Sequence, residues 1–194
     1  MIRFYLGLDL GQVSDYTALA IVEDIRGAAP PVLHLRHLER LTLGTSYPDM
    51  ARHVKALLTT TELAGKTVCV VDATGVGRPV VDMLREAEVQ PLTAVTITGG
   101  DVASHDGGDW RVPKRDLVST LQVLLQNETL KIAKGLVLAE VLVREMQNFR
   151  VKINIATGHD SYEAWRESEH DDLVLAVAMA CWYARAFVEP VWMY

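Results

Sequence analysis

Several apolar runs in this sequence end or begin at aspartate. Leu6-Gly7-Leu8 leads into Asp9, and the run from Val68 to Val71 leads into Asp72. Far downstream, His170-Asp171-Asp172 opens a nearly all-apolar segment. A carboxylate at the tip of a buried element is costly to desolvate unless a cation meets it. Three such tips in one chain indicate a shared divalent-metal site.

The order of the predicted elements indicates one mixed sheet. Three consecutive strands are expected over 3–10, 16–23 and 32–41, and they form an antiparallel meander. Helices and strands then alternate. Helices are predicted over 47–58, 79–87, 113–127, 136–146 and 169–187, and strands over 67–71, 92–98 and 130–132. This is the layout of an α/β RNase H-like fold, a mixed central sheet flanked by helices, with the first strand beside the strand that ends at Asp72.

Two further segments have distinct patterns. Residues 149–155 alternate between apolar and polar side chains, which is typical of a half-buried strand. The turn at Gly158-His159-Asp160 would return it through 161–165, which predicts an additional β-hairpin. The segment 99–109 carries four glycines and is predicted to be a mobile loop.

Composition narrows the class of protein. A chain of 194 residues fits one domain, which we expect to span 1–194. Cys69 and Cys181 have no CxxC partner, so we expect neither a zinc site nor a disulfide framework. We expect both to be free thiols in a reducing cytoplasm. The apolar helix near the C-terminus is too short for a membrane span.

Clustered carboxylates favour hard cations such as Mg²⁺ or Mn²⁺. Two such ions can activate water and stabilise a leaving oxygen in phosphodiester cleavage. In this hypothesis Asp9 bridges two ions, Asp72 holds one and a helix acid holds the other. Asp172 is favoured over Asp171 because it continues into a ridge of small residues, Ala176, Ala180 and Ala184, that can pack close to a sheet. Asp171 is then an auxiliary acid or a ligand of the other ion.

Four motifs resemble the nuclease domain of the large terminase subunit of tailed phages. They are Gly7-Leu8-Asp9-Leu10-Gly11 with Asp15, Val71-Asp72-Ala73-Thr74-Gly75-Val76-Gly77, Val112-Pro113-Lys114-Arg115, and the stretch from His170 to Ala176. The resemblance covers Leu6 to about Ala180. It implies an Mg²⁺- or Mn²⁺-dependent endonuclease that cuts concatemeric double-stranded viral DNA during packaging, in the cytoplasm of the host cell. It maps Asp9, Asp72 and Asp172 onto an acidic triad, with Asp171 and Asp15 as auxiliary acids.

The same resemblance implies partners, namely a terminase ATPase domain, a small terminase subunit and a portal. The sequence has no GxxxxGK[ST] loop, so we expect either an excised nuclease domain or a stand-alone relative without a motor of its own.

A local basic region suggests where DNA would lie. The net charge of −6 excludes a generally basic nucleic-acid coat, yet residues 110–152 hold eight basic and four acidic side chains, a balance of +4. The candidate DNA contacts from this region are Arg111, Lys114, Arg115, Arg150 and Lys152. Arg150 and Lys152 are predicted to share one face of a strand.

Other interpretations stay open at this stage. Taken singly, Asp9 suits a turn, Asp72 suits a turn or a cap, and Asp171 and Asp172 suit a helix N-terminus. Among functions, a RuvC-like Holliday-junction resolvase would share fold and metals. A sugar-kinase or actin-like ATPase is built from two such domains, whereas 194 residues supply only one. A non-catalytic DNA-binding domain of the same fold would have little reason to keep three buried acids.

Overall fold

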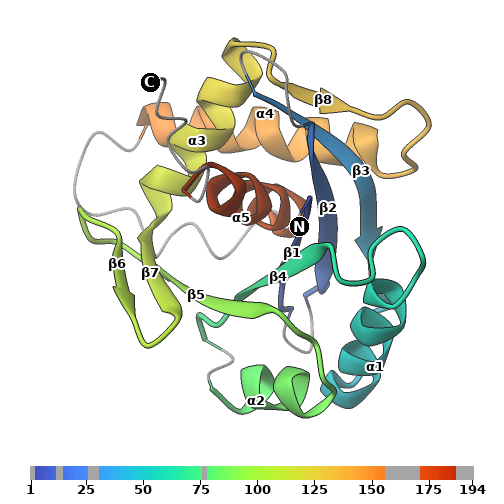
Figure 1. Cartoon of the computed structure of the whole chain (residues 1–194). Coiled ribbons are helices and arrows are strands. Elements are labelled where there is room, and N and C mark those ends of the chain that lie inside the picture. Colours follow the sequence, from blue (N-terminus) through green and yellow to red (C-terminus); the bar gives the residue numbers. More distant parts are fainter. Residues whose placement is uncertain (1–2, 12–14, 26–30, 76–77, 156–170, 187–194) are drawn as a thin grey trace, which may run out of the picture.

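The computed structural model contains one mixed sheet with helices on both faces (Figure 1). It describes residues 3–11, 15–25, 31–75, 78–155 and 171–186, and for 149–155 the backbone alone. The strands are β1 (Phe4–Asp9), β2 (Ala18–Ile25), β3 (Val32–Arg40), β4 (Thr67–Asp72), β5 (Leu92–Thr98), β6 (Ser104–Asp106), β7 (Asp109–Pro113) and β8 (Leu130–Ile132). The helices are α1 (Tyr47–Leu58), α2 (Arg78–Glu86), α3 (Lys114–Gln126), α4 (Ala139–Ile155) and α5 (Asp172–Ala186).

Strand pairing confirms the predicted fold class. The strand order is β6-β7-β5-β4-β1-β2-β3-β8. The meander β1-β2-β3 is antiparallel, whereas β4 pairs parallel with β1, β5 with β4, and β7 with β5. Strands β1, β3, β4, β5 and β7 therefore all end at the same side of the sheet, which we call the carboxyl edge.

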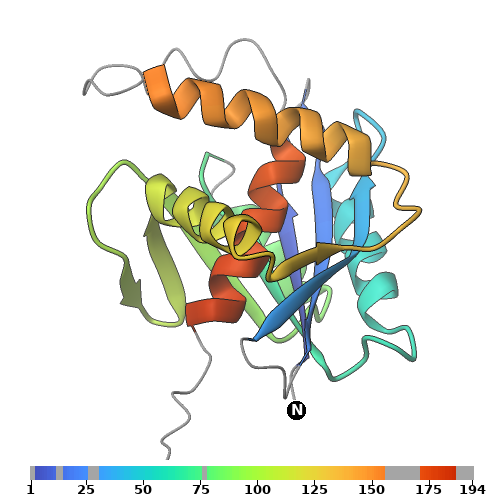
Figure 2. The ribbon, with the colours of Figure 1, turned by 90° about the horizontal axis from the view of Figure 1, so that it is seen from above.

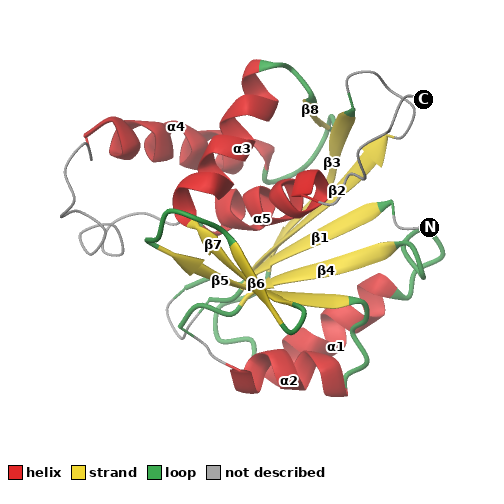
Figure 3. Cartoon of the chain, turned by 60° about the vertical axis from the view of Figure 1, so that its left-hand side comes forward, coloured by secondary structure: helices red, strands yellow, loops and turns green. Residues whose placement is uncertain are grey.

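Two apolar cores lie on the two faces of the sheet. Helices α1 and α2 cover one face, and α3, α4 and α5 cover the other (Figure 3). Alternate strand residues divide between these cores: Val70 packs with the α5 side, while Cys69 and Val71 pack with the α1 and α2 side. Position along a strand therefore decides which helix layer a side chain meets.

Helix α5 packs closely on β1. A Cβ atom at Gly7 would lie 1.9 Å from the carbonyl oxygen of Ala176, so only glycine fits beneath the helix. The small residues Ala176, Ala180 and Ala184 are all buried, which confirms the predicted close-packing ridge. Figure 2 shows α5 running across the sheet with its N-terminal end beside α4. The start of α5 is therefore held at the carboxyl edge.

Two sequence predictions of local structure were wrong. Residues 149–155 continue α4 as helix instead of forming a strand, and the predicted return strand at 161–165 lies outside the described residues. Half of the predicted loop at 99–109 is a β-hairpin, in which β6 and β7 join at Gly107-Gly108 with φ of +58° and +100°. Strand β7 then leads the chain directly to Lys114 at the carboxyl edge.

Two simpler expectations concern cysteine and the membrane. Cys69 and Cys181 are free and buried, as predicted, and burial raises the pKa of each thiol to about 12. Within the described ranges, none of the helices combines the length and the apolar character needed to cross a membrane.

Candidate functional site

Asp9 and Asp72 end neighbouring parallel strands. The register pairs Leu8 with Val71, which sets the two aspartates side by side at the carboxyl edge. Alternation places both on the face covered by α5, because Gly7 touches α5 and Val70 packs in the same core. The structure thus brings together the two strand acids that the sequence singled out.

The Asp9 carboxyl is surrounded by other acids. Burial raises its pKa well above the ordinary value, and the nearby charges of Asp72, Asp171 and Asp172 raise it further. Lys114 lowers it, but by less. A carboxyl in this environment carries negative charge only at a high energetic cost unless another cation comes close.

A tight turn orients Asp72. The backbone N–H of Thr74 donates a hydrogen bond of 2.7 Å to Oδ1 of Asp72, and the Thr74 hydroxyl oxygen accepts one of 2.7 Å from the Ile97 N–H. Burial nevertheless raises the pKa of Asp72, although hydrogen bonds from the side chain and the backbone of Thr74, the charge of Lys114 and a hydrogen bond with Asp9 oppose the rise. Asp72 is therefore held in one place by the strands β4 and β5.

The helix acids Asp171 and Asp172 have different partners. Asp171 lies 3.6 Å from the Lys114 ammonium, measured from Oδ2 to Nζ. Asp172 is buried and accepts two hydrogen bonds from Arg40, Nε to Oδ2 at 2.7 Å and Nη2 to Oδ1 at 2.8 Å. The pKa of Asp171 is raised, mainly by burial.

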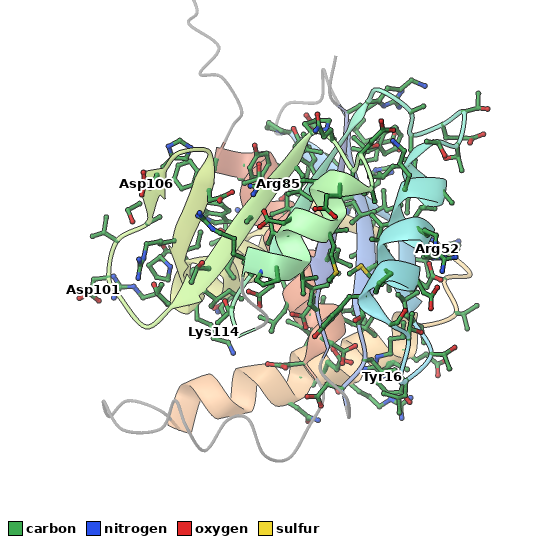
Figure 4. All side chains as sticks on the ribbon, turned by 90° about the horizontal axis from the view of Figure 1, so that it is seen from below. Tyr16, Arg52, Arg85, Asp101, Asp106 and Lys114 are labelled. Atoms are coloured by element: carbon green, nitrogen blue, oxygen red, sulfur yellow. The ribbon has the colours of Figure 1, made fainter. Side chains whose placement is uncertain are left out.

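Lys114 is a cation within the acidic group. Its side chain is 19% exposed, and burial lowers its pKa to about 8 even though Asp171, Asp9 and Asp72 favour the charged form. Figure 4 shows Lys114 and Tyr16 at the same end of the molecule, the end along which α4 runs. The residue was predicted as a DNA contact, and the structure places it next to the acids.

Arg40 and Glu145 were not identified from the sequence. Arg40 ends β3, and its Nη2 also donates to Oε1 of Glu145 at 2.5 Å. Glu145 comes from α4 and accepts the Val174 N–H through Oε2 at 3.1 Å. Burial and the charge of Asp172 raise the pKa of Glu145 to about 8. The Arg40 guanidinium also lies 4.9 Å from the centre of the Tyr16 ring.

An irregularity in β3 turns Arg40 toward this group. Leu35 pairs with Val22 and His37 pairs with Ile21, so Arg36 is an extra residue in the register. Leu35 and Leu38 consequently face the same core. The shift explains why the alternation of β3 was imperfect in the sequence, and it puts Arg40 on the α5 face.

The remaining predicted site residues are spread more widely. Asp15 is exposed in the turn before β2, and Arg111 is exposed on β7. Arg115 is half exposed and pairs with Asp101, Nη1 to Oδ1 at 2.6 Å. Arg150 and Lys152 belong to α4, and a helix does not place alternate residues on one face, so the predicted shared strand face is wrong. Their side chains lie outside the described part of the structure.

The charges at this edge do not balance among the described residues. Five acids, Asp9, Asp72, Asp171, Asp172 and Glu145, face the two cations Lys114 and Arg40. Within the same described ranges, no group of three or more His, Cys, Asp or Glu side chains is arranged so that it could hold a metal ion as it stands. Carboxylate oxygens and excess negative charge suit a hard divalent cation, with waters completing its coordination.

Comparison with known proteins agrees with this fold. The family model described as the terminase RNaseH-like domain matches residues 6–183. No relative was found in the search of curated proteins.

Solved structures are similar over most of the chain. The large terminase nuclease from thermophilic phage G20c has a TM-score of 0.57 at 20% identity, covering 92% of this chain and 80% of that one. The human cytomegalovirus terminase nuclease domain, Mn-soaked with inhibitor bound, has a TM-score of 0.56 at 16% identity, covering 93% and 82%. A Mn-soaked structure of the same domain gives 0.54 at 16% identity, covering 97% and 86%. At these identities the likeness shows the fold.

Proposed function

The chain belongs to the family of terminase RNase H-like domains, and from this premise we propose that it is a metal-dependent endonuclease that cleaves double-stranded DNA. The observation that carries the proposal is the buried group of acids around Asp9, where burial and then repulsion by the neighbouring acids raise the Asp9 pKa. Such strained electrostatics are typical of functional sites. A purely structural site would have balanced the number of acids with an equal number of cations.

The residues at the carboxyl edge fit Mg²⁺ or Mn²⁺. Their oxygens are the donors that these ions prefer, and divalent charge would offset the excess of acids. One protein of the same fold, the human cytomegalovirus terminase nuclease domain, was solved in two Mn-soaked structures. Bound ions supply an activated water and neutralise charge on the phosphodiester during hydrolysis.

Each acid has a distinct role in this proposal. Asp9, central among the acids, Asp72, oriented by Thr74, and Asp172 would hold the divalent ions. Asp171 would assist from the position adjacent to Asp172. Asp15 stays a candidate auxiliary acid in the turn beyond β1. Holding the acids in fixed positions allows the ions to bind without reorganising the site.

Basic side chains near these acids would contact DNA. Lys114 lies at the site itself. Its ammonium pairs with Asp171 in the structure, and it could pair with a DNA phosphate when DNA is bound. Arg111 and Arg115 flank it on β7 and α3, and Arg150 and Lys152 lie on α4. Contacts to phosphate of this kind bind DNA without regard to sequence and weaken as salt rises.

The family also supports a proposal for the biological setting. We propose that residues 1–194 act as one nuclease domain that cuts concatemeric viral DNA during packaging. An ATPase domain, a small terminase subunit and a portal would be its partners, and the host cytoplasm its location. The proposed chemistry uses only residues of this chain and bound ions, so the cleavage activity can be tested on this chain alone.

A plasmid cleavage assay tests the proposal. The wild type and Asp9→Asn are incubated with supercoiled plasmid in Mn²⁺, Mg²⁺ or EDTA, and nicked and linear products are quantified. We expect cleavage with a divalent ion, none in EDTA, and none above background for Asp9→Asn. Cleavage that persists in EDTA, or no cleavage by the wild type with any ion, would refute the proposed function.

A further inference from the structure

The Arg40 guanidinium joins three elements at the carboxyl edge. It extends from the end of β3 and donates to both oxygens of Asp172 at the start of α5, at 2.7 and 2.8 Å. Its Nη2 also reaches Glu145 on α4 at 2.5 Å. Two parallel hydrogen bonds to one carboxylate fix its rotation as well as its position, which a single bond does not.

The contact between Arg40 and Asp172 is buried, and Glu145 binds both Arg40 and the first turn of α5. The side chains of Arg40, Asp172 and Glu145 are 16%, 8% and 6% exposed. Glu145 also accepts the Val174 N–H, one of the first-turn amides of α5 that lack a partner within the helix. Arg40 and Glu145 together therefore fix the first turn of α5 as well as the Asp172 carboxylate.

We propose that Arg40 is a positioning residue that sets the Asp172 carboxylate for metal binding. The inference rests on the proposed function, because it assumes that Asp172 binds a metal ion. An ionised carboxylate has about four acceptor sites, so the two bonds from Arg40 leave sites free for a cation. A partner of a metal ligand that fixes the ligand's orientation typically changes metal affinity by about 10- to 100-fold.

The direction in which metal affinity changes when Arg40 is replaced distinguishes an orienting role from a purely electrostatic one. A positive guanidinium beside a metal ligand repels a cation, so on charge alone its removal would tighten metal binding. If Arg40 acts by orienting Asp172, its removal weakens metal binding even though the repulsion is gone. Arg40→Lys keeps the charge and removes the paired hydrogen bonds, so it isolates the geometric part.

The experiment measures Mn²⁺ binding directly, by electron paramagnetic resonance of free Mn²⁺, on the full chain. The variants are Arg40→Lys, Arg40→Gln and the control Arg85→Gln, and thermal unfolding is recorded for each. Arg85 also pairs with two acids, Asp82 and Asp109, and Figure 4 shows it away from Lys114. We expect the Kd for Mn²⁺ to rise about tenfold in Arg40→Gln and about threefold in Arg40→Lys, with no change in Arg85→Gln.

Each other outcome overturns the inference. Unchanged Mn²⁺ binding in folded Arg40→Lys, or tighter binding in Arg40→Gln, would show that Arg40 acts through its charge or not at all. Loss of folding in both Arg40 variants would assign it to the fold alone. If the wild type binds Mn²⁺ and cleaves DNA while the variants behave like it, only this inference fails. A wild type that binds no Mn²⁺ removes the proposed function as well.

Discussion

Two buried acidic regions of this molecule are built in opposite ways. Glu23, in the middle of β2, is 5% exposed and is met by two arginines, Arg3 and Arg36, the latter at 2.7 Å from Nε to Oε2. At the carboxyl edge, five acids face Lys114 and Arg40 in the described part of the chain. One region has more cations than acids, and the other has the reverse.

The difference separates a structural charge from a functional one. A buried charge is tolerated in a fold when partners compensate it, as at Glu23. An excess of acids destabilises the fold, and proteins keep such an excess where a ligand or a reaction makes use of it. The comparison therefore predicts that equivalent substitutions in the two regions have opposite consequences.

The largest expected difference is in cleavage. Asp72→Asn removes a proposed metal ligand while keeping the Thr74 hydrogen bond, and we expect cleavage to fall on the order of 10³-fold, as when a main electrostatic group of an active site is removed. Glu23→Gln, equally buried, should retain most of the cleavage rate. The measurement is the initial rate of plasmid cleavage at saturating Mn²⁺. Equal decreases in the two variants would erase the distinction between the regions.

Stability should change in the opposite direction. In EDTA at neutral pH, Asp9→Asn should raise the free energy of unfolding, because it removes a buried carboxyl that neighbouring acids repel. Glu23→Gln should lower it by about 1–2 kcal/mol, since Arg3 and Arg36 lose their buried partner yet remain half in water. Urea unfolding followed by circular dichroism measures both. Destabilisation by Asp9→Asn would contradict the view that this site is strained.

Much of the acidic edge could be predicted from the sequence because strand order determines it. The meander followed by strand–helix units places the ends of β1 and β4 next to each other, so Asp9 and Asp72 had to meet. The small-residue ridge of α5 likewise predicted its close approach to the sheet at Gly7. These features depend on short-range patterns and on topology.

Arg40 and Glu145 could not be found in the same way. Their contact spans 105 residues, and the contact of Arg40 with Asp172 spans 132, so no local pattern joins them. The extra residue Arg36 also shifts the alternation of β3, and that shift can be recognised only once β2 is placed beside it. One signal was available: β3 runs parallel to β1 in the predicted meander, so its last residue had to lie at the same edge as Asp9.

The error at 149–155 has a different cause. The alternation there fits a strand, but Leu142, Met146, Phe149 and Ile153 also follow the three- and four-residue spacing of a helix. The helix that begins at Ala139 simply continues through the segment. The hairpin of β6 and β7 was missed although a Gly-Gly pair such as Gly107-Gly108 is a known signal for a two-residue hairpin turn between strands.

A smaller effect is expected from pH. The folded protein holds protons on Asp9, Asp72, Asp171 and Glu145 at a pH where the unfolded chain has released them, and for Glu145 this window runs from 4.5 to about 8. The folded state then binds more protons than the unfolded state, so stability in EDTA should fall as pH rises from about 5 to about 8. Lys114 acts with the opposite sign, and only above its lowered pKa of about 8.

Thermal unfolding at about pH 5.5 and about pH 8 measures this pH effect. Mn²⁺ should raise the Tm more at the higher pH, because metal binding requires deprotonated acids. Glu145→Gln should flatten the pH dependence, because it removes a carboxyl whose pKa the fold raises to about 8. A Tm that rises with pH in EDTA over this range would contradict the assigned excess of acids.

The smallest expected effect concerns the basic side chains beside the site. Arg111 and Arg115 lie on β7 and at the start of α3, next to Lys114, whereas Arg52 lies on α1 (Figure 4). If the carboxyl edge receives DNA, neutralising Arg111 and Arg115 to Gln should weaken binding of a short duplex. The slope of log K against log salt should fall by about 0.9 for each phosphate that the double variant no longer neutralises.

The control is Arg52→Gln. Arg52 is an exposed arginine that pairs with Asp49, and its replacement should change neither the affinity nor the salt slope. Fluorescence anisotropy in Ca²⁺ or EDTA at several salt concentrations gives both values, and equal slopes for the double variant and Arg52→Gln would place the DNA elsewhere on the surface.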